Sequence, residues 1–308
     1  MFQKRIFSGR KMIFGIGVFD GVHRGHRLLL DAVLRLADEF SAVPAAITFA
    51  PHPRKILFPD QPPRLLIGLE ERIRLLKKYG MQEVAVIPFT RELASLPPEE
   101  FLNNLTDFDG VLCGICVGAN WHFGAKAAGG KKELQAFADA RGIRFEPVPE
   151  LEWQGETVSS TRIRRAIAAG RLKEAGEMLG RPYRLTGTVV HGYRAATSDL
   201  ACPTANLVTE EGILPPDGVY AAKAFTPDGM EHWGAVNLGI APTYRRPGGE
   251  RRLELHLLDY SGDLYDKELS VEFVRCLRPE RAFPDTEALR KQITQDIAEI
   301  RKLQHEQL

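Results

Sequence analysis

The chain has 308 residues, a length that predicts two domains of ordinary size. Hydrophobic residues make up 44% and charged residues 26%, as in globular proteins, and no apolar run approaches the roughly 18 residues of a membrane span. The net charge of +1 argues against a general nucleic-acid surface, so any phosphate must be held locally. Residues 1–11 lack a signal-peptide core and the four cysteines do not suggest a disulfide scaffold, so we expect a cytoplasmic protein without a membrane partner.

The first half of the chain alternates short apolar runs with amphipathic segments, which is typical of a parallel α/β sheet. We expect strands over residues 12–18, 45–49, 83–87, 111–117 and 144–148. We expect helices over residues 26–40, 68–79, 131–141, 159–170 and 173–179, with another that begins at Pro97. Because ligands gather at the carboxyl ends of such strands, His52 and Pro53, directly after the second strand, are candidates for binding a second substrate.

The first strand and first helix are joined by a turn with the sequence Gly17-Val18-Phe19-Asp20-Gly21-Val22-His23-Arg24-Gly25-His26. Gly25 lets the backbone approach a ligand closely, and the helix N-terminus offers unpaired N–H groups that favour phosphate. His23 and His26 add hydrogen bonds and, when protonated, charge. Histidines beside a turn are about as often structural, but a strand before them and a helix after them favour a nucleotide site.

This turn resembles the signature of the HxGH nucleotidyltransferases, and its longer form GxFDGVHxGH resembles the FAD synthetases. Taken alone, Ser159–Arg164 is a capped basic helix start, but FAD synthetases carry Ser-Ser-Thr-x-Ile-Arg near the triphosphate. The resemblance implies a Rossmann-like domain in which His23 and His26 are catalytic. The residues that it implies for ATP binding are Gly17, Phe19, Asp20, Gly25, Asn120, Ser160, Thr161 and Arg164.

The sequence Cys113-Gly114-Ile115-Cys116 has the spacing of redox or metal-binding cysteines. It lies inside an expected strand, whereas a thioredoxin-type pair needs a helix N-terminus and a zinc site needs further ligands. We therefore expect these cysteines to pack in the core.

The composition changes near Arg181, so we expect domains over residues 1–180 and 181–308. Strand-like segments follow over residues 184–191, 218–225, 231–238, 252–258 and 268–276. Such a series is typical of a small antiparallel barrel or sandwich. A terminal helix follows from Asp285, with Leu289, Ile293, Ile297 and Ile300 on one face.

A second candidate site lies in this half. Thr204 and Asn206, in Pro-Thr-Ala-Asn, point to one side of an extended segment and carry oxygens that suit Mg²⁺ and its phosphates. Glu254 lies opposite the leucines of an alternating strand, where it either faces solvent or takes a proton from a substrate hydroxyl.

These segments, with the motif NxGxxPT over residues 237–243, resemble the riboflavin kinase domain, and the two halves in this order resemble the bacterial bifunctional riboflavin kinase/FAD synthetases. The resemblance implies an N-terminal half that transfers AMP from ATP to FMN, giving FAD, and a C-terminal barrel that phosphorylates riboflavin. Thr204 and Asn206 would then hold magnesium and ATP, and Glu254 would be the catalytic base.

One loop departs from the family pattern. Residues 193–202 read Tyr-Arg-Ala-Ala-Thr-Ser-Asp-Leu-Ala-Cys where a glycine-rich loop is usual. This departure keeps open a single-activity FAD synthetase whose second domain only binds flavin or nucleotide. An adenylyltransferase for a pantetheine phosphate and a non-enzymatic flavin sensor are further alternatives, which the second motif set and the reactive residues disfavour. The oligomeric state does not follow from the sequence.

Overall fold

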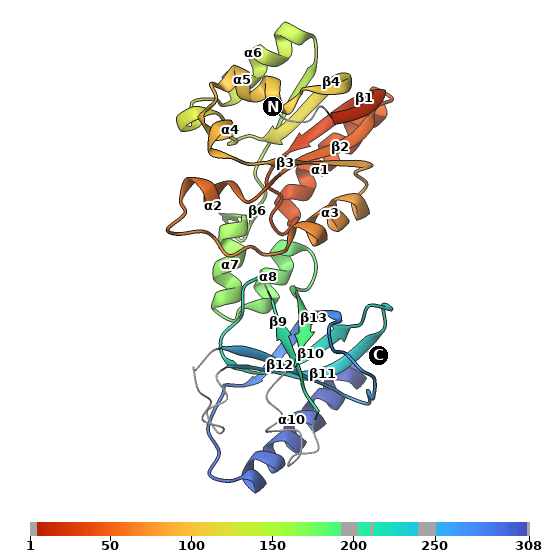
Figure 1. Ribbon diagram of the computed structural model, residues 1–308, viewed down its shortest axis with the longest axis vertical. Coiled ribbons are helices and arrows are strands. Elements are labelled where there is room, and N and C mark those ends of the chain that lie inside the picture. The colour runs from red at the N-terminus through yellow and green to blue at the C-terminus, as the bar shows by residue number, and fades with distance from the viewer. Residues whose placement is uncertain (1–4, 192–202, 210–211, 240–250, 307–308) are drawn as a thin grey trace. The chain divides into compact units, whose positions relative to one another are not determined.

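The computed structural model describes residues 5–191, 203–209, 212–239 and 251–306 (Figure 1). It divides into two compact units, Met1–Ser160 and Thr161–Leu308. Within the described ranges, no helix combines the length and the apolar character that a membrane crossing requires. The loop at residues 193–202, and residues 240–243 of the NxGxxPT motif, lie outside the described residues.

The first unit is built on a five-stranded parallel sheet. Its strands are β1 (Arg5–Ile16), β2 (Val43–Ala50), β3 (Glu83–Pro88), β4 (Phe108–Gly118) and β5 (Arg144–Val148). They lie in the order β3-β2-β1-β4-β5, and each neighbouring pair is parallel. The strand order reverses between β1 and β4, which is the arrangement of a doubly wound, Rossmann-like domain. The expected α/β fold is confirmed.

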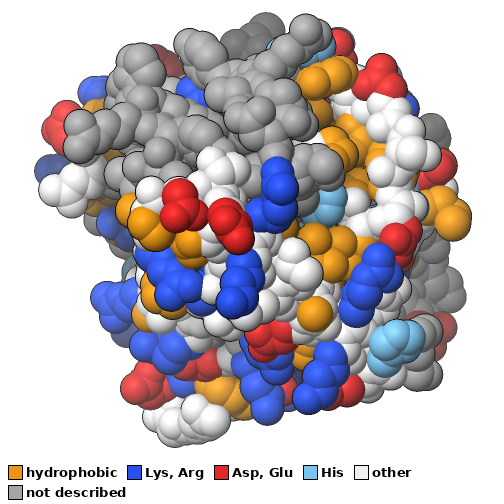
Figure 2. All heavy atoms as spheres, turned by 90° about the horizontal axis from the view of Figure 1, so that it is seen from below, with side chains coloured by type: hydrophobic (Ala, Val, Ile, Leu, Met, Phe, Trp, Pro, Cys, Tyr) orange, Lys and Arg blue, Asp and Glu red, His pale blue; other side chains and the backbone are white. Residues whose placement is uncertain are grey.

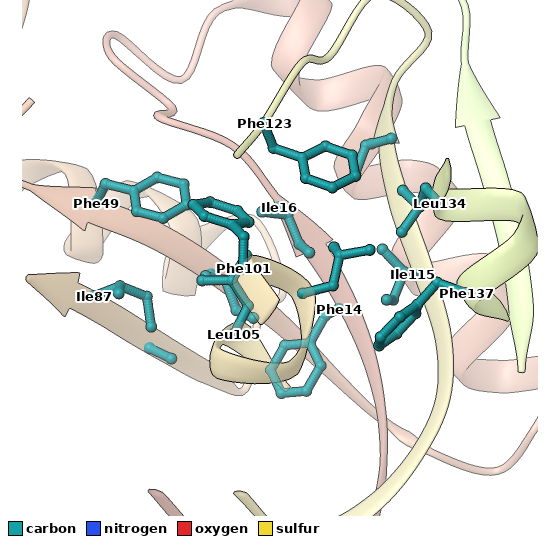
Figure 3. Close-up of a cluster of buried hydrophobic side chains, with 14 of the residues drawn as sticks. Phe14, Ile16, Phe49, Ile87, Phe101, Leu105, Ile115, Phe123, Leu134 and Phe137 are labelled. Atoms are coloured by element: carbon teal, nitrogen blue, oxygen red, sulfur yellow. The ribbon is translucent and has the colours of Figure 1, made fainter. Parts of the chain in front are cut away.

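Helices cover both faces of this sheet, because residues of both faces are apolar. On one face, Phe14 and Ile16 of β1 pack against α5 (Pro98–Leu105) and α6 (Lys131–Arg141) in the cluster of Figure 3. On the other face, Ile13 packs against α1 (Arg24–Glu39) and α3 (Leu69–Lys78). The alternation along β1 thus places successive side chains in two separate cores.

Cys116 belongs to the second of these cores and is 0% exposed, and Cys113 packs at its edge. The expected structural role of this pair is confirmed. Burial raises the pKa of the Cys116 thiol to about 12. Because the thiolate is the nucleophile, Cys116 should be inert in the folded protein.

We therefore expect iodoacetamide near neutral pH to leave Cys116 unmodified in the native protein and to alkylate it after denaturation in urea. The exposed Cys276 is the internal control and should react in both states. Peptide mass spectrometry reads each site separately. Alkylation of native Cys116 at the rate of Cys276 would contradict its burial.

The expected start of β1 at Met12 was wrong, since the strand begins at Arg5 and ends at Ile16. Its first residues pair with β4, with Arg5 opposite Phe108 and Ile6 opposite Asp109. Backbone pairing does not require apolar side chains, so hydrophobicity alone misses this extension. Short elements were also missed, because a few residues carry no period. These are α2 (Pro53–Leu57), α4 (Arg91–Ser95), the 3₁₀ turn Ala125–Ala127 and the hairpin of β6 (Glu152–Trp153) and β7 (Glu156–Thr157).

The second unit contains most of α7 (Ser160–Ala168), then α8 (Leu172–Leu179) and a closed barrel. The barrel strands are β8 (Arg184–Val190), β9 (Ala205–Val208), β10 (Gly218–Phe225), β11 (Glu231–Gly239), β12 (Arg252–Leu257) and β13 (Glu268–Arg278). They close in the order β10-β11-β12-β9-β8-β13 through antiparallel pairs. The sequence left a barrel and a sandwich as alternatives, and the structure shows the barrel. The sequence pattern did not predict β9.

The terminal helix α10 (Thr286–Glu306) begins where expected, and Ile300 and Leu303 are buried against the barrel. Arg278 of β13 and Asp296 of α10 form a largely buried ion pair, with Nη2 to Oδ2 at 2.9 Å and Nε to Oδ2 at 3.0 Å. On the surface seen in Figure 2, basic and acidic side chains are intermixed. Residues of α10 also form exposed ion pairs, among them Arg275–Glu299 and Arg301–Asp259.

Candidate active sites

The turn between β1 and α1 has a strained backbone. Phe19 has φ 54°, Gly21 has φ 86° and Val22 has φ 40°. For residues other than glycine, such values cost ~1–3 kcal/mol each and persist only where the surroundings enforce them. The turn directly follows the carboxyl end of β1, and α1 begins directly after it.

The two histidines of this turn lie against each other. His23 is the N-cap of α1 and is 5% exposed, and its Nδ1 accepts a hydrogen bond of 3.3 Å from the backbone N–H of His26. Since Nδ1 accepts, a neutral His23 ring carries its proton on Nε2. The two rings stack with centroids 3.6 Å apart and planes 16° apart. The arrangement orients Nε2 of His23 as a donor at the start of a helix that favours anions.

Small residues and an aromatic ring hold these histidines in place. A Cβ at Gly25 would lie 3.2 Å from Nδ1 of His23 and 3.3 Å from the backbone oxygen of Val158, tighter than ordinary contact. A Cβ at Gly17 would lie 3.2 Å from the ring of Phe19. Phe19 is fully buried, and its ring meets that of His26 edge-on at 5.3 Å. A side chain at Gly25 would therefore crowd the imidazole of His23, and one at Gly17 would crowd the ring of Phe19 that contacts His26.

Asp20 and Ser160, both expected to bind ATP, make hydrogen bonds to the backbone of the protein. Asp20 is 1% exposed, and its Oδ1 accepts from the backbone N–H of Leu66 at 2.8 Å and of Ile67 at 3.4 Å. The hydroxyl of Ser160 donates to the backbone oxygen of Asp20 at 2.9 Å. These contacts fix the turn from two sides.

The switch point of the sheet lies between the ends of β1 and β4, where a doubly wound fold binds its ligand. Asn120 is exposed two residues after β4, and the turn with His23 follows β1, so both come directly after the strands that flank the switch point. His52 lies after the neighbouring β2 as the N-cap of α2, with Nδ1 accepting from the N–H of Arg54 at 3.1 Å, and Pro53 is the first residue of that helix.

Of the remaining expected residues, Thr161 and Arg164 lie on α7 and belong to the second unit. Thr161 is exposed and Arg164 is half-buried.

The barrel brings Asn206 and Glu254 together. They are register partners of β9 and β12, so their side chains share one face of the sheet. Leu253, Leu255 and Leu257 point the opposite way and are buried, as the alternation predicted. Oδ1 of Asn206 is buried and has no hydrogen-bond partner among the described residues, so it is an acceptor suited to a cation or a donor from a ligand.

Two further residues of this face were not predicted as site residues, although the alternation of β12 places His256 on the side of Glu254 and Asn237 begins the NxGxxPT motif. Asn237 of β11 is the register partner of Glu254 on its other side, so the row runs Asn206, Glu254, Asn237. The ring Nδ1 of His256 lies 2.9 Å from the backbone oxygen of Pro203 and ties β12 to the segment that carries Thr204. The alternation of β12 signalled His256, but no signal in the sequence fixes the register that selects Asn237.

The parallel sheet with its HxGH turn, followed by the closed barrel with its Asn–Glu row, defines a two-domain nucleotide-dependent transferase. The family model for FAD synthetase matches residues 7–162, and the model for riboflavin kinase matches residues 179–304. The bifunctional riboflavin kinase/FMN adenylyltransferase of Pseudomonas fluorescens is 37% identical over 295 residues, 96% of this chain and 93% of that protein. The chain belongs to the family of bifunctional riboflavin kinase/FMN adenylyltransferases.

Two further similarities cover most of the chain, the first in the family and the second in the fold. The protein of the same description from Bacillus subtilis is 31% identical, covering 93% of this chain and 90% of its own length. A crystal structure titled as a macrolide-efflux protein from Streptococcus pneumoniae has a TM-score of 0.82 and 28% identity, covering 95% of this chain and 94% of that chain. These similarities extend through both units of the chain.

Proposed function

We propose that this protein makes flavin cofactors by two ATP-dependent transfers: phosphorylation of riboflavin to FMN, then adenylylation of FMN to FAD with release of pyrophosphate. The observation that carries the proposal is that one chain holds both an HxGH turn at a sheet switch point and a Glu–Asn pair on adjacent barrel strands. We assign the first transfer to residues 181–308 and the second to residues 1–180.

In the adenylyl half, a phosphate oxygen of FMN would attack the α-phosphorus of ATP, and pyrophosphate would leave. Negative charge grows on the bridging oxygen as its bond to phosphorus breaks. His23 would donate from Nε2, and His26 beside it would add a second donor at the helix N-terminus. Gly17, Phe19, Gly25, Asp20 and Ser160 would shape this turn, while Asn120, Thr161 and Arg164 would bind ATP and His52 and Pro53 the flavin.

In the kinase half, Glu254 would take the proton from the terminal hydroxyl of riboflavin as that oxygen attacks the γ-phosphorus of ATP. Asn206 and Thr204 would hold the Mg²⁺ of the nucleotide, and the buried, unpartnered Oδ1 of Asn206 fits a hard cation. When bound, Mg²⁺ offsets charge on the phosphates.

We also propose that the protein works in the cytoplasm. Thiols remain reduced there, which suits the free Cys113, Cys116 and Cys276.

The experiment that tests this function uses the purified full-length chain with riboflavin, ATP and Mg²⁺, with FMN and FAD separated by chromatography. We expect both products, and neither after chelation of the metal. FAD from supplied FMN without any FMN from riboflavin would select the single-activity alternative. Absence of both products would contradict the proposal.

The loop at residues 193–202 favours a slow kinase. If the loop takes the phosphate-cradling shape that the family resemblance implies, glycine in place of Ala196 and Ala201 would allow a positive φ and close backbone approach to phosphate, whereas a non-glycine residue in such a conformation costs ~1–3 kcal/mol. We expect the double variant Ala196→Gly/Ala201→Gly to form FMN faster and to bind ATP more tightly, measured as initial rates over a range of ATP concentrations. FAD formation from FMN in the same samples is the control. An already fast wild-type kinase that ignores both glycines would show that the loop closes by another geometry.

A further inference from the structure

Arg72 is a buried arginine of α3 to which the two proposed reactions give no role. Its side chain is 1% exposed. Its Nη1 donates to the backbone oxygens of Val18 at 2.9 Å and Phe49 at 3.0 Å, and it lies 3.1 Å from Oγ1 of Thr48. The fully buried Thr48 donates its own hydroxyl to the same Val18 oxygen at 2.9 Å. One guanidinium and one hydroxyl therefore converge on one backbone carbonyl.

The two backbone carbonyls that Arg72 binds lie where two loops begin. Val18 is the last residue before the strained segment that begins at Phe19 and leads to His23. Phe49 is near the end of β2, directly before the segment that carries His52. Arg72 thus ties the turn proposed to bind the triphosphate to the segment proposed to bind the flavin.

The turn needs such a tie because its backbone is unfavourable by itself. Phe19 and Val22 both have positive φ, a conformation held only where surrounding contacts over-determine it. Asp20 and Ser160 fix the middle of the turn through the contacts described above. Arg72 and Thr48 fix its beginning, and hydrogen bonds from a buried cation are among the stronger ones that a carbonyl accepts.

We propose that Arg72, assisted by Thr48, is a positioning residue for adenylyl transfer. It acts through the backbone of Val18 and Phe49, and so sets the position of the imidazoles of His23 and His26 relative to the flavin segment. This inference rests on the proposed function of the first unit. Because small displacements of catalytic groups cost rate more than ground-state affinity, the effect falls mainly on kcat.

The test compares Arg72→Met with Arg74→Met in the full-length protein. Arg74 lies on the same helix but is well exposed and pairs with Glu71, so its variant removes the same group without touching the turn. For FAD formation from FMN, we expect Arg72→Met to lower kcat by about 10–100-fold, with KM for ATP and FMN within about threefold of wild type. Arg74→Met should match wild type, and all variants should phosphorylate riboflavin at the wild-type rate.

Thr48→Val is the second variant, because it keeps the shape of the side chain and removes only the hydroxyl. It should lower kcat in the same reaction by a smaller factor, and the loss in the double variant should be smaller than the product of the two single losses, since both groups share Val18. Thermal melting by circular dichroism establishes whether each variant is folded at the assay temperature. If Arg72→Met is unfolded there, the result for Thr48→Val alone tests the inference.

Unchanged kcat in the folded variants, or a rise in KM alone, would overturn the inference. A loss of kcat that is fully explained by the unfolded fraction of the variant would also overturn the inference. Wild-type protein assayed in parallel distinguishes the two proposals. If the wild type makes no FAD, the proposed function is contradicted. If the wild type makes FAD and the variants are unaffected, only the role of Arg72 is contradicted.

Discussion

Replacing His23 or His26 by alanine is expected to abolish FAD formation from FMN and to leave FMN formation from riboflavin intact. Each ring is at the start of α1, within one unit of the fold, and His23 is oriented by the bond between its Nδ1 and the N–H of His26. Loss of one donor aimed at developing phosphate charge costs ~2–4 kcal/mol, or two to three decades in rate.

The measurement is the initial rate of each product, made separately from FMN and from riboflavin. His305→Ala, an exposed histidine of α10, is the matched control and should keep both rates. The rings stack at 3.6 Å, so the two losses should be less than additive in the double variant. If the double variant still makes FAD at near the wild-type rate, the histidines are structural.

Glu254→Gln is expected to have the opposite effect, suppressing FMN formation while adenylylation of supplied FMN continues. The substitution keeps the size of the side chain and one carbonyl oxygen beside Asn206, but removes the group that accepts a proton. Loss of a general base costs ~10²–10⁴-fold in rate.

Glu268→Gln, on the exposed start of β13, is the matched control because it removes a carboxylate from the same barrel. Riboflavin phosphorylation is followed at saturating ATP, so that a change in nucleotide affinity does not enter the rate. A fully active Glu254→Gln enzyme would make Glu254 part of a solvated sheet face.

The elements whose ends are marked by clear boundary residues, such as glycine, were predictable from the sequence. The observed bounds of α6 match the prediction residue for residue, because Gly130 and Gly142 flank an amphipathic run and Gly142 takes the left-handed conformation that ends a helix. β5 and β10 were also found at their full length. The HxGH turn was recognisable because its spacing lies on one contiguous stretch of chain.

Features that depend on register or burial were not predictable. The periodicity of α3 places Arg72 on the apolar face with Leu76 and Arg74 on the other side, but it does not reveal that the whole side chain of Arg72 is buried, since long arginines on such a face commonly reach solvent. Asn237 joins Glu254 only through the pairing of β11 with β12, which local sequence leaves open. The four residues of β9 were too short to show a period, although they complete the barrel.

The brevity of β9 has a consequence for how the second unit could be inhibited. The strand that completes the cylinder is also the one that bears Asn206. Such a short strand holds few ladder bonds, so local opening is expected to begin there, and an opened cylinder no longer presents Asn206 beside Glu254. A small molecule that wedged between β9 and β12 would therefore inactivate the unit by dismantling the scaffold. Because ATP binds the closed cylinder, raising its concentration would oppose this inhibitor although the two occupy different places.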